Sequence, residues 1–177
     1  MGEIRFGVIG AGQIAHNSCA DIDSHNGAVI AAASDVNEPR LAELAGKFDI
    51  PKTYADSADL ITDPDLDAIY IGVPNKFHAP LAKASLEAGK NVMLDKPFAM
   101  NIAEAQGVAD AAKASGKLFM VGMNQRFRPE SQTIRNLVAD GKLGEVYHAK
   151  AFWFRRSGIP KLGTWFGNKE IAGGGAL

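Results

Sequence analysis

Residues 4–15 have the sequence IRFGVIGAGQIA, in which a short apolar run ends at two closely spaced glycines, Gly10 and Gly12. The run is too short for a stable helix and is rich in residues that favour strands. Helix-compatible sequence follows, and a second apolar run, residues 28–33, then leads to Asp35. This order of strand, glycine turn, helix, strand and acidic residue is typical of a βαβ unit that binds a dinucleotide.

Each part of this unit has a physical task. Gly10 allows the tight turn off the strand, and Gly12 lets the backbone approach the pyrophosphate with no Cβ in the way. The helix that starts near Gln13 and Ile14 presents free N–H groups and its positive dipole end to the phosphates. Asp35 lies 25 residues after Gly10, where it can accept hydrogen bonds from the adenosine ribose hydroxyls.

The residues after the second strand favour NAD over NADP. Asp35 is followed by Val36 and Asn37, so no arginine or lysine is adjacent to hold a 2′-phosphate, and the carboxylate would repel one. Arg40 is close enough in sequence to leave NADP as the alternative. We therefore predict NAD as the cofactor.

Strand and helix patterns alternate along the first two thirds of the chain. Further strands are expected near residues 52–54, 67–74, 91–94 and 118–123, and helices over residues 78–87 and 102–115. This alternation predicts an α/β fold with a doubly wound parallel sheet and helices on both faces.

The pattern changes after residue 124. A helix over residues 130–139 is followed by a long strand over residues 145–155, with no partner strand after it. A strand of that length is not expected to stand unpaired. We therefore expect a dinucleotide-binding domain over residues 1–124 and, over residues 125–177, the truncated start of a C-terminal α/β domain.

Composition and charge narrow the class of protein. The formal net charge is −1 and the pI is about 6.4, with no basic block that would indicate nucleic acid or an anionic membrane as a partner. No apolar run reaches the roughly 18 residues that a membrane span needs. A single cysteine, Cys19, excludes an internal disulfide bond and favours a small apolar role in the first helix. We expect a soluble, cytoplasmic protein.

Ligands of doubly wound sheets bind at the carboxyl ends of the strands. The residues predicted at those ends outside the first βαβ unit are Val73, Pro74, Asn75, His78, Asp95, Lys96 and Asn124. We predict that they bind the cofactor together with Gly10, Gly12, Gln13, Ile14 and Asp35.

Lys96 is the candidate catalytic residue, because an ammonium beside a carboxylate can hold a substrate hydroxyl and relay a proton. His78 has two interpretations, as a cofactor contact or as a packing residue at the start of a helix. No cluster of histidine, cysteine and acidic residues has metal-ligand spacing, so no metal site is predicted.

These motifs together resemble the N-terminal part of the glucose–fructose oxidoreductase / inositol dehydrogenase / rhizopine-catabolism (Gfo/Idh/MocA) oxidoreductases. The matching segments, in the order of that family, are GAGQIA, Asp35, VPNKFH, DKPFAMN, GMNQRFRP and the terminal AGGGAL. The resemblance implies a Rossmann domain followed by a substrate and oligomerisation domain. It also implies hydride transfer between nicotinamide and a secondary alcohol of a sugar, polyol or related cyclic alcohol, and a homo-oligomer when the protein is full length.

By position, Lys96 is similar to the catalytic lysine of the family's EKP-type motif, with Asp95 in place of the usual glutamate. The resemblance places a proton-transfer histidine beyond Leu177, so we expect this chain to bind cofactor but turn over little or nothing. Two alternatives stay open. One is a non-catalytic NAD-binding sensor or scaffold, and the other is an enzyme that reduces a dihydrodiol or a biliverdin-like ring with NADPH.

Overall fold

A six-stranded parallel sheet forms the centre of the structure, a computed structural model that describes residues 2–154, 156–158, 160 and 163–174. The strand order is β3-β2-β1-β4-β5-β6. The strands are β1 (Ile4–Ile9), β2 (Ala28–Ser34), β3 (Lys52–Tyr54), β4 (Ala68–Ile71), β5 (Asn91–Leu94) and β6 (Phe119–Val121). The order reverses between β1 and β4, so the sheet has the switch point of a doubly wound fold, as predicted.

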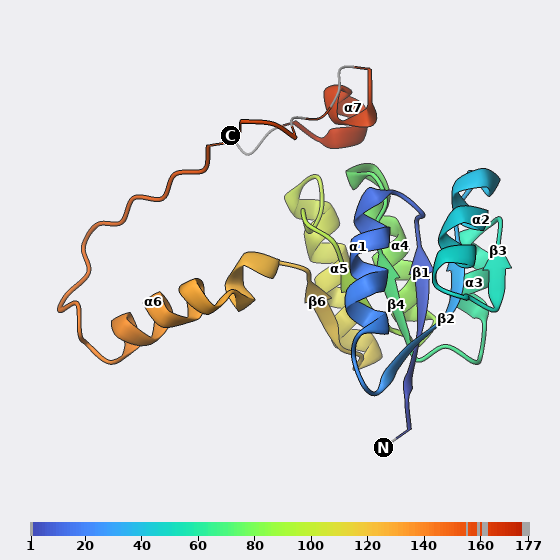
Figure 1. The fold of residues 1–177 in the computed structure, drawn as a ribbon, viewed down its shortest axis with the longest axis horizontal. Coiled ribbons are helices and arrows are strands. Elements are labelled where there is room, and N and C mark those ends of the chain that lie inside the picture. Colours follow the sequence, from blue (N-terminus) through green and yellow to red (C-terminus); the bar gives the residue numbers. More distant parts are fainter. Residues whose placement is uncertain (1, 155, 159, 161–162, 175–177) are drawn as a thin grey trace.

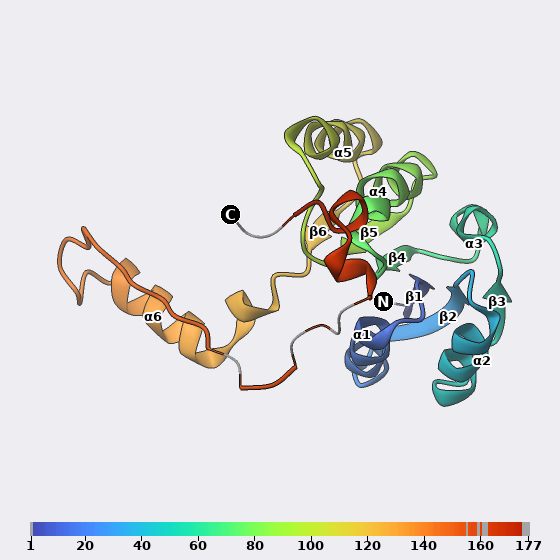
Figure 2. The ribbon, with the colours of Figure 1, turned by 90° about the horizontal axis from the view of Figure 1, so that it is seen from above.

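Helices cover both faces of this sheet. They are α1 (Gln13–Asp23), α2 (Glu38–Lys47), α3 (Ser57–Thr62), α4 (His78–Glu87) and α5 (Ile102–Ser115). Figure 2 shows α1 and α2 on one face and α3, α4 and α5 on the other. Short 3-10 turns, η1 (Asn75–Phe77) and η2 (Asn124–Phe127), follow β4 and β6.

The core has two halves because a parallel strand buries both of its faces. Alternate residues of β1 take opposite sides: Val8 packs with Leu44 beneath α1 and α2, whereas Ile9 belongs to the cluster of Leu60 and Leu86 beneath α3 and α4. The sheet is therefore held rigidly between two layers, which fixes where its strand ends lie.

Asparagine side chains cap the starts of α2 and α5. Asn37 Oδ1 accepts a hydrogen bond from the Arg40 backbone N–H at 3.0 Å and so caps α2. At the start of α5, Asn101 Oδ1 accepts from the Glu104 backbone N–H at 2.9 Å, and Gly116 ends the helix with φ of 64°. The Glu104 side chain in turn accepts from the Met100 backbone N–H at 3.1 Å, so both side chains bond backbone donors at the start of α5.

The chain beyond β6 leaves the sheet. Helix α6 (Pro129–Ala139) points away from the body of the molecule (Figure 1), and its apolar residues Ile134, Leu137 and Val138 are exposed. No strand forms over residues 145–154, so the predicted strand over residues 145–155 is wrong for the described part of that range; residue 155 lies outside the described residues. A strand needs a neighbouring strand to satisfy its backbone hydrogen bonds, and the sheet of the described residues includes none that pairs with this segment.

The end of the chain returns to the sheet. After η3 (Trp165–Gly167), the short helix α7 (Lys169–Ala172) lies above the edge at which the strands end (Figure 1). Asn168 Oδ1 caps α7 by accepting from the Glu170 backbone N–H at 2.9 Å. Among the described residues, no helix is long and apolar enough to cross a membrane.

Candidate cofactor site

The turn between β1 and α1 contains two glycines with different constraints. Gly10 has φ of +100°, and an added Cβ would lie 2.4 Å from the Gly72 carbonyl oxygen, so backbone packs directly against it. Its N–H donates to the Ser34 carbonyl at 2.8 Å. Gly12 instead faces open space, because a Cβ there would meet nothing within 4 Å. Gly10 thus shapes the turn, whereas the bare side of Gly12 leaves room for a ligand.

Helix α1 starts at this turn without a side-chain cap. Gly12 is its N-cap residue, and Gln13 and Ile14 form its first turn. Backbone N–H groups at an uncapped helix start are donors for an anion, and the helix dipole adds to their effect. The open space at Gly12 and these donors together fit the pyrophosphate of a dinucleotide.

Asp35 follows β2, and its side chain bonds to the glycine turn between β1 and α1. Its Oδ2 accepts a hydrogen bond from the Ala11 backbone N–H at 2.6 Å, and its Oδ1 accepts from the Asn37 backbone N–H at 2.7 Å. Each carboxylate oxygen keeps a further lone pair for another donor. The predicted ribose acceptor therefore lies next to the predicted phosphate turn, as a dinucleotide requires.

The segment after β4 contains four of the predicted residues. Val73 and Pro74 lead into η1, where the Asn75 side chain donates from Nδ2 to the Ala172 carbonyl at 2.8 Å. That bond connects the candidate site to α7. His78 begins α4 and is only 1% exposed, with its ring nitrogens directed at backbone carbonyls. The packing interpretation of His78 agrees with this burial, and a cofactor contact by His78 stays a prediction.

The segment after β5 carries Asp95 and Lys96. The Asp95 N–H donates to the Ile71 carbonyl at 2.9 Å, which continues the β4–β5 pairing past the end of the strand. Lys96 is exposed, and within the described residues its ammonium has no hydrogen bond or ion pair. An exposed ammonium at the rim of the site is free to meet a substrate.

A cavity of about 260 Å³ lies between α1 and the ends of β4, β5 and β6. It brings together the predicted residues Ile14, Asp95 and Asn124. Four polar lining residues were not predicted from the sequence: Asn17, Ser18, Asp21 and Tyr70. The first three lie on the inner face of α1, and the helical spacing of positions 14, 17, 18 and 21 is the signal that could have found them.

Tyr70 is the buried polar group of this cavity. Burial raises the pKa of its hydroxyl to about 12, and the hydrogen bond with Ser18 acts in the opposite direction. Tyr70 is therefore neutral at physiological pH and keeps its O–H as a donor.

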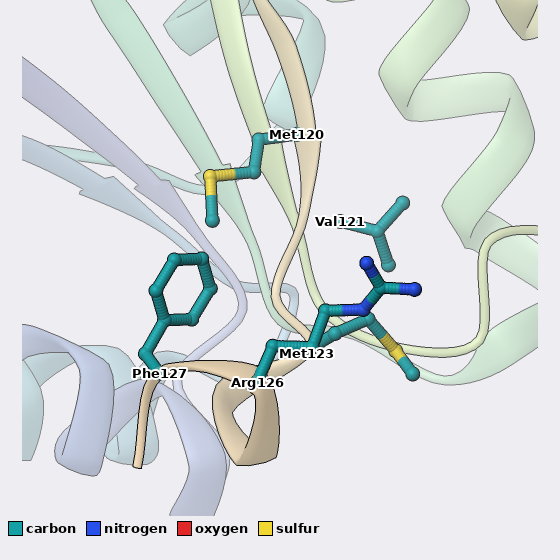
Figure 3. A pocket seen from close by; sticks show the side chains of 5 residues that line it. All are labelled: Met120, Val121, Met123, Arg126 and Phe127. Carbon is teal, nitrogen blue, oxygen red and sulfur yellow. The ribbon is translucent and has the colours of Figure 1, made fainter. Parts of the chain in front are cut away.

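A larger cavity of about 410 Å³ borders β6 but contains none of the predicted cofactor residues. It is lined by Met120, Val121, Met123, Arg126 and Phe127, and Figure 3 shows Met120 and Phe127 directed toward the same space. It shares Met120 and Phe127 with the cavity beside α1 but is lined by no residue of the glycine turn.

Within the described residues, neither a cluster of metal ligands nor a cysteine lines the cavity beside α1. In the part of the chain described, no three His, Cys, Asp or Glu residues are grouped so that they could hold a metal ion. Cys19 is buried inside α1, and burial raises the pKa of its thiol to about 12. A thiol of that pKa is not a nucleophile at neutral pH, which agrees with the predicted apolar role.

Comparison with known proteins agrees with this geometry. Residues 4–123 match the Gfo/Idh/MocA family model, described as an oxidoreductase family with an NAD-binding Rossmann fold. The chain belongs to the Gfo/Idh/MocA oxidoreductase family. The match extends over the sheet and the strand ends, so the predicted family and fold class are both confirmed.

Members of the Gfo/Idh/MocA family similar to this chain act on different substrates. Trans-1,2-dihydrobenzene-1,2-diol dehydrogenase of Mus musculus is 34% identical over 98% of this chain and 52% of its own length. D-glucoside 3-dehydrogenase of Escherichia coli K12 is 34% identical over 98% of this chain and 50% of its own. The chain thus spans about half the length of these curated relatives.

A solved structure of the family shows the same architecture. The scyllo-inositol dehydrogenase of Lactobacillus casei, with bound NAD(H) and scyllo-inositol, superposes with a TM-score of 0.77 at 26% identity. The superposition covers 81% of this chain and 43% of that one.

Proposed function

We propose that this chain binds NAD(H) through its glycine turn and serves as the cofactor-binding part of a dehydrogenase. Its substrate would be a secondary alcohol of a sugar, polyol or related cyclic alcohol. The observation that supports the proposal is the hydrogen bond from the Ala11 N–H to Asp35, next to the open space at Gly12. This arrangement supplies ribose acceptors and phosphate donors side by side.

The proposed choice of NAD rests on charge. A 2′-phosphate would have to lie against the Asp35 carboxylate, and the next residue, Val36, is 92% exposed but carries no charge to offset the repulsion. The absence of a basic residue at positions 36 and 37 leaves nothing adjacent to hold that phosphate.

The proposed chemistry assigns separate tasks to the chain's own residues. Bound nicotinamide would supply the hydride acceptor or donor. Lys96 would hold the reacting hydroxyl by donating a hydrogen bond to its oxygen, and it would stabilise negative charge on that oxygen while a base in the complete protein, which the family resemblance makes a histidine, takes the hydroxyl proton. Asn75 and Asp95 would border the cofactor on either side of that position. We further propose that the chain alone binds cofactor and turns over little.

Separate titrations with NADH and NADPH, followed by nicotinamide fluorescence, test this function. We expect saturable binding of NADH, with NADPH binding at least about tenfold weaker because of the repulsion at Asp35. Binding of neither nucleotide by the folded chain would overturn the proposal. Equal affinity for both would overturn the assignment of NAD alone.

A further inference from the structure

His78 lies between the exits of two neighbouring strands. Its Nε2 is 2.8 Å from the Val73 carbonyl oxygen, after β4, and its Nδ1 is 2.6 Å from the Pro97 carbonyl oxygen, after β5. The side chain is buried, so water does not compete for these bonds. Each tautomer of the neutral ring donates to one of the carbonyls, and the imidazolium donates to both. The ring thus lies between the two loops and donates a hydrogen bond to at least one of them.

Lys96 is held only through its backbone neighbours. Its ammonium makes no bond within the described residues, but the residues on either side are fixed. The Asp95 N–H is bonded to the Ile71 carbonyl at 2.9 Å, and the Pro97 carbonyl is the partner of His78. Lys96 therefore lies between two anchors, one supplied by β4 and one by the imidazole.

We propose that His78 is a positioning residue that holds the loop carrying Lys96 at the rim of the site. The catalytic consequence rests on the proposed function of Lys96, whereas the link between the loops does not. A direct cofactor contact is disfavoured, because both ring nitrogens already face carbonyls and the side chain is 1% exposed.

Hydrogen–deuterium exchange on the chain without nucleotide tests the link. His78→Phe keeps a ring of similar size but removes both ring nitrogens, and His78→Gln keeps an amide donor of similar reach. We expect the backbone amides of residues 95–100 to exchange about tenfold faster in His78→Phe, with an intermediate rate in His78→Gln. The amides of β1 and β2 should exchange as in the wild type.

Ser85→Ala is the matched control. Ser85 is also a buried polar residue of α4, but its Oγ donates to the Leu81 carbonyl within the same helix at 2.8 Å. Loss of the Ser85 hydroxyl should leave the hydrogen exchange rates of residues 95–100 unchanged. If His78→Phe does not fold, the comparison of His78→Gln with Ser85→Ala still tests whether His78 holds the loop that carries Lys96.

Two results would overturn the proposal. One is unchanged exchange of residues 95–100 in the histidine variants, and the other is a uniform increase that also reaches β1 and β2. A wild-type chain that fails to bind NADH, but shows the expected exchange pattern in the variants, would refute the proposed function and leave the link intact.

Discussion

The carboxylate of Asp35 lies 2.6 Å from the backbone nitrogen of Ala11, so the acidic end of β2 holds the glycine turn that follows β1. The two residues are neighbours because β1 and β2 pair in parallel, with Ile9 opposite Ser34. An acidic residue at this position thus has a structural partner in the chain itself. Its second oxygen accepts from the Asn37 N–H, which also orders the start of α2.

Replacing Asp35 should therefore affect both the turn and the choice of nucleotide. We expect Asp35→Ala to weaken NADH binding by about tenfold or more, because charge-assisted hydrogen bonds are lost. Asp35→Asn should retain more affinity and discriminate less against NADPH, because the repulsive charge is gone. Fluorescence titration measures both effects, and wild-type affinity in Asp35→Ala would contradict the assignment.

The two glycines of the turn should respond differently to the same methyl group. Gly10→Ala places a Cβ against the Gly72 carbonyl at a positive φ, so we expect the free energy of unfolding to fall by about 2 kcal/mol or more. The Cβ added by Gly12→Ala meets no atom within 4 Å, so the free energy of unfolding should change by less than about 1 kcal/mol. The same Cβ should greatly weaken NADH binding. Denaturant unfolding and titration separate the effects; normal NADH binding by Gly12→Ala would count against the proposed pyrophosphate position.

Lys96→Met should leave the fold nearly unchanged, since the ammonium is exposed and unbonded within the described residues. We expect a change in unfolding free energy within about 0.5 kcal/mol. In the complete enzyme that we propose, kcat should fall by about 10²–10⁴-fold. Lys113→Met, an exposed lysine of α5, is the control. Unchanged turnover in Lys96→Met would overturn the assignment of Lys96 as the catalytic residue.

The hydrogen bond from Asn75 to Ala172 should hold α7 against the site. We expect Asn75→Ala to increase hydrogen exchange of the amides of residues 169–173 several-fold, because one side-chain bond to the segment is lost. Asn91→Ala removes a similar bond, to the Asp67 carbonyl, at the opposite end of the sheet and should not affect α7. Equal exchange rates of residues 169–173 in Asn75→Ala and Asn91→Ala would show that Asn75 does not hold α7.

Asp63 should make the stability of the protein depend on acid pH. The Asp65 backbone N–H, and after it the Tyr54 hydroxyl and the Lys52 ammonium, hold the pKa of Asp63 below its ordinary value, against the effect of burial. A lowered folded-state pKa stabilises the protein above the unfolded pKa of about 3.9, and this stabilisation is lost as the pH falls through the folded value. Melting curves between about pH 6 and pH 3 should therefore show a smaller decrease in Tm for Asp63→Asn than for the wild type. Parallel curves would contradict this assignment.

The sequence by itself determined the elements whose signals are local. The βαβ unit with Gly10 and Gly12 and the alternation of strands and helices depend on residues within a few positions of one another. For the same reason the sequence indicated which residues end the strands. The family model, which matches residues 4–123, confirms the fold class drawn from these signals.

Only the tertiary structure decided which of those residues touch. The bond between Asp35 and Ala11, the place of His78 between two carbonyls and the return of α7 to Asn75 are contacts that no local pattern specifies. The strand expected over residues 145–155 does not form over residues 145–154: its local pattern favours a strand, but backbone hydrogen bonds need a neighbour that local sequence cannot supply.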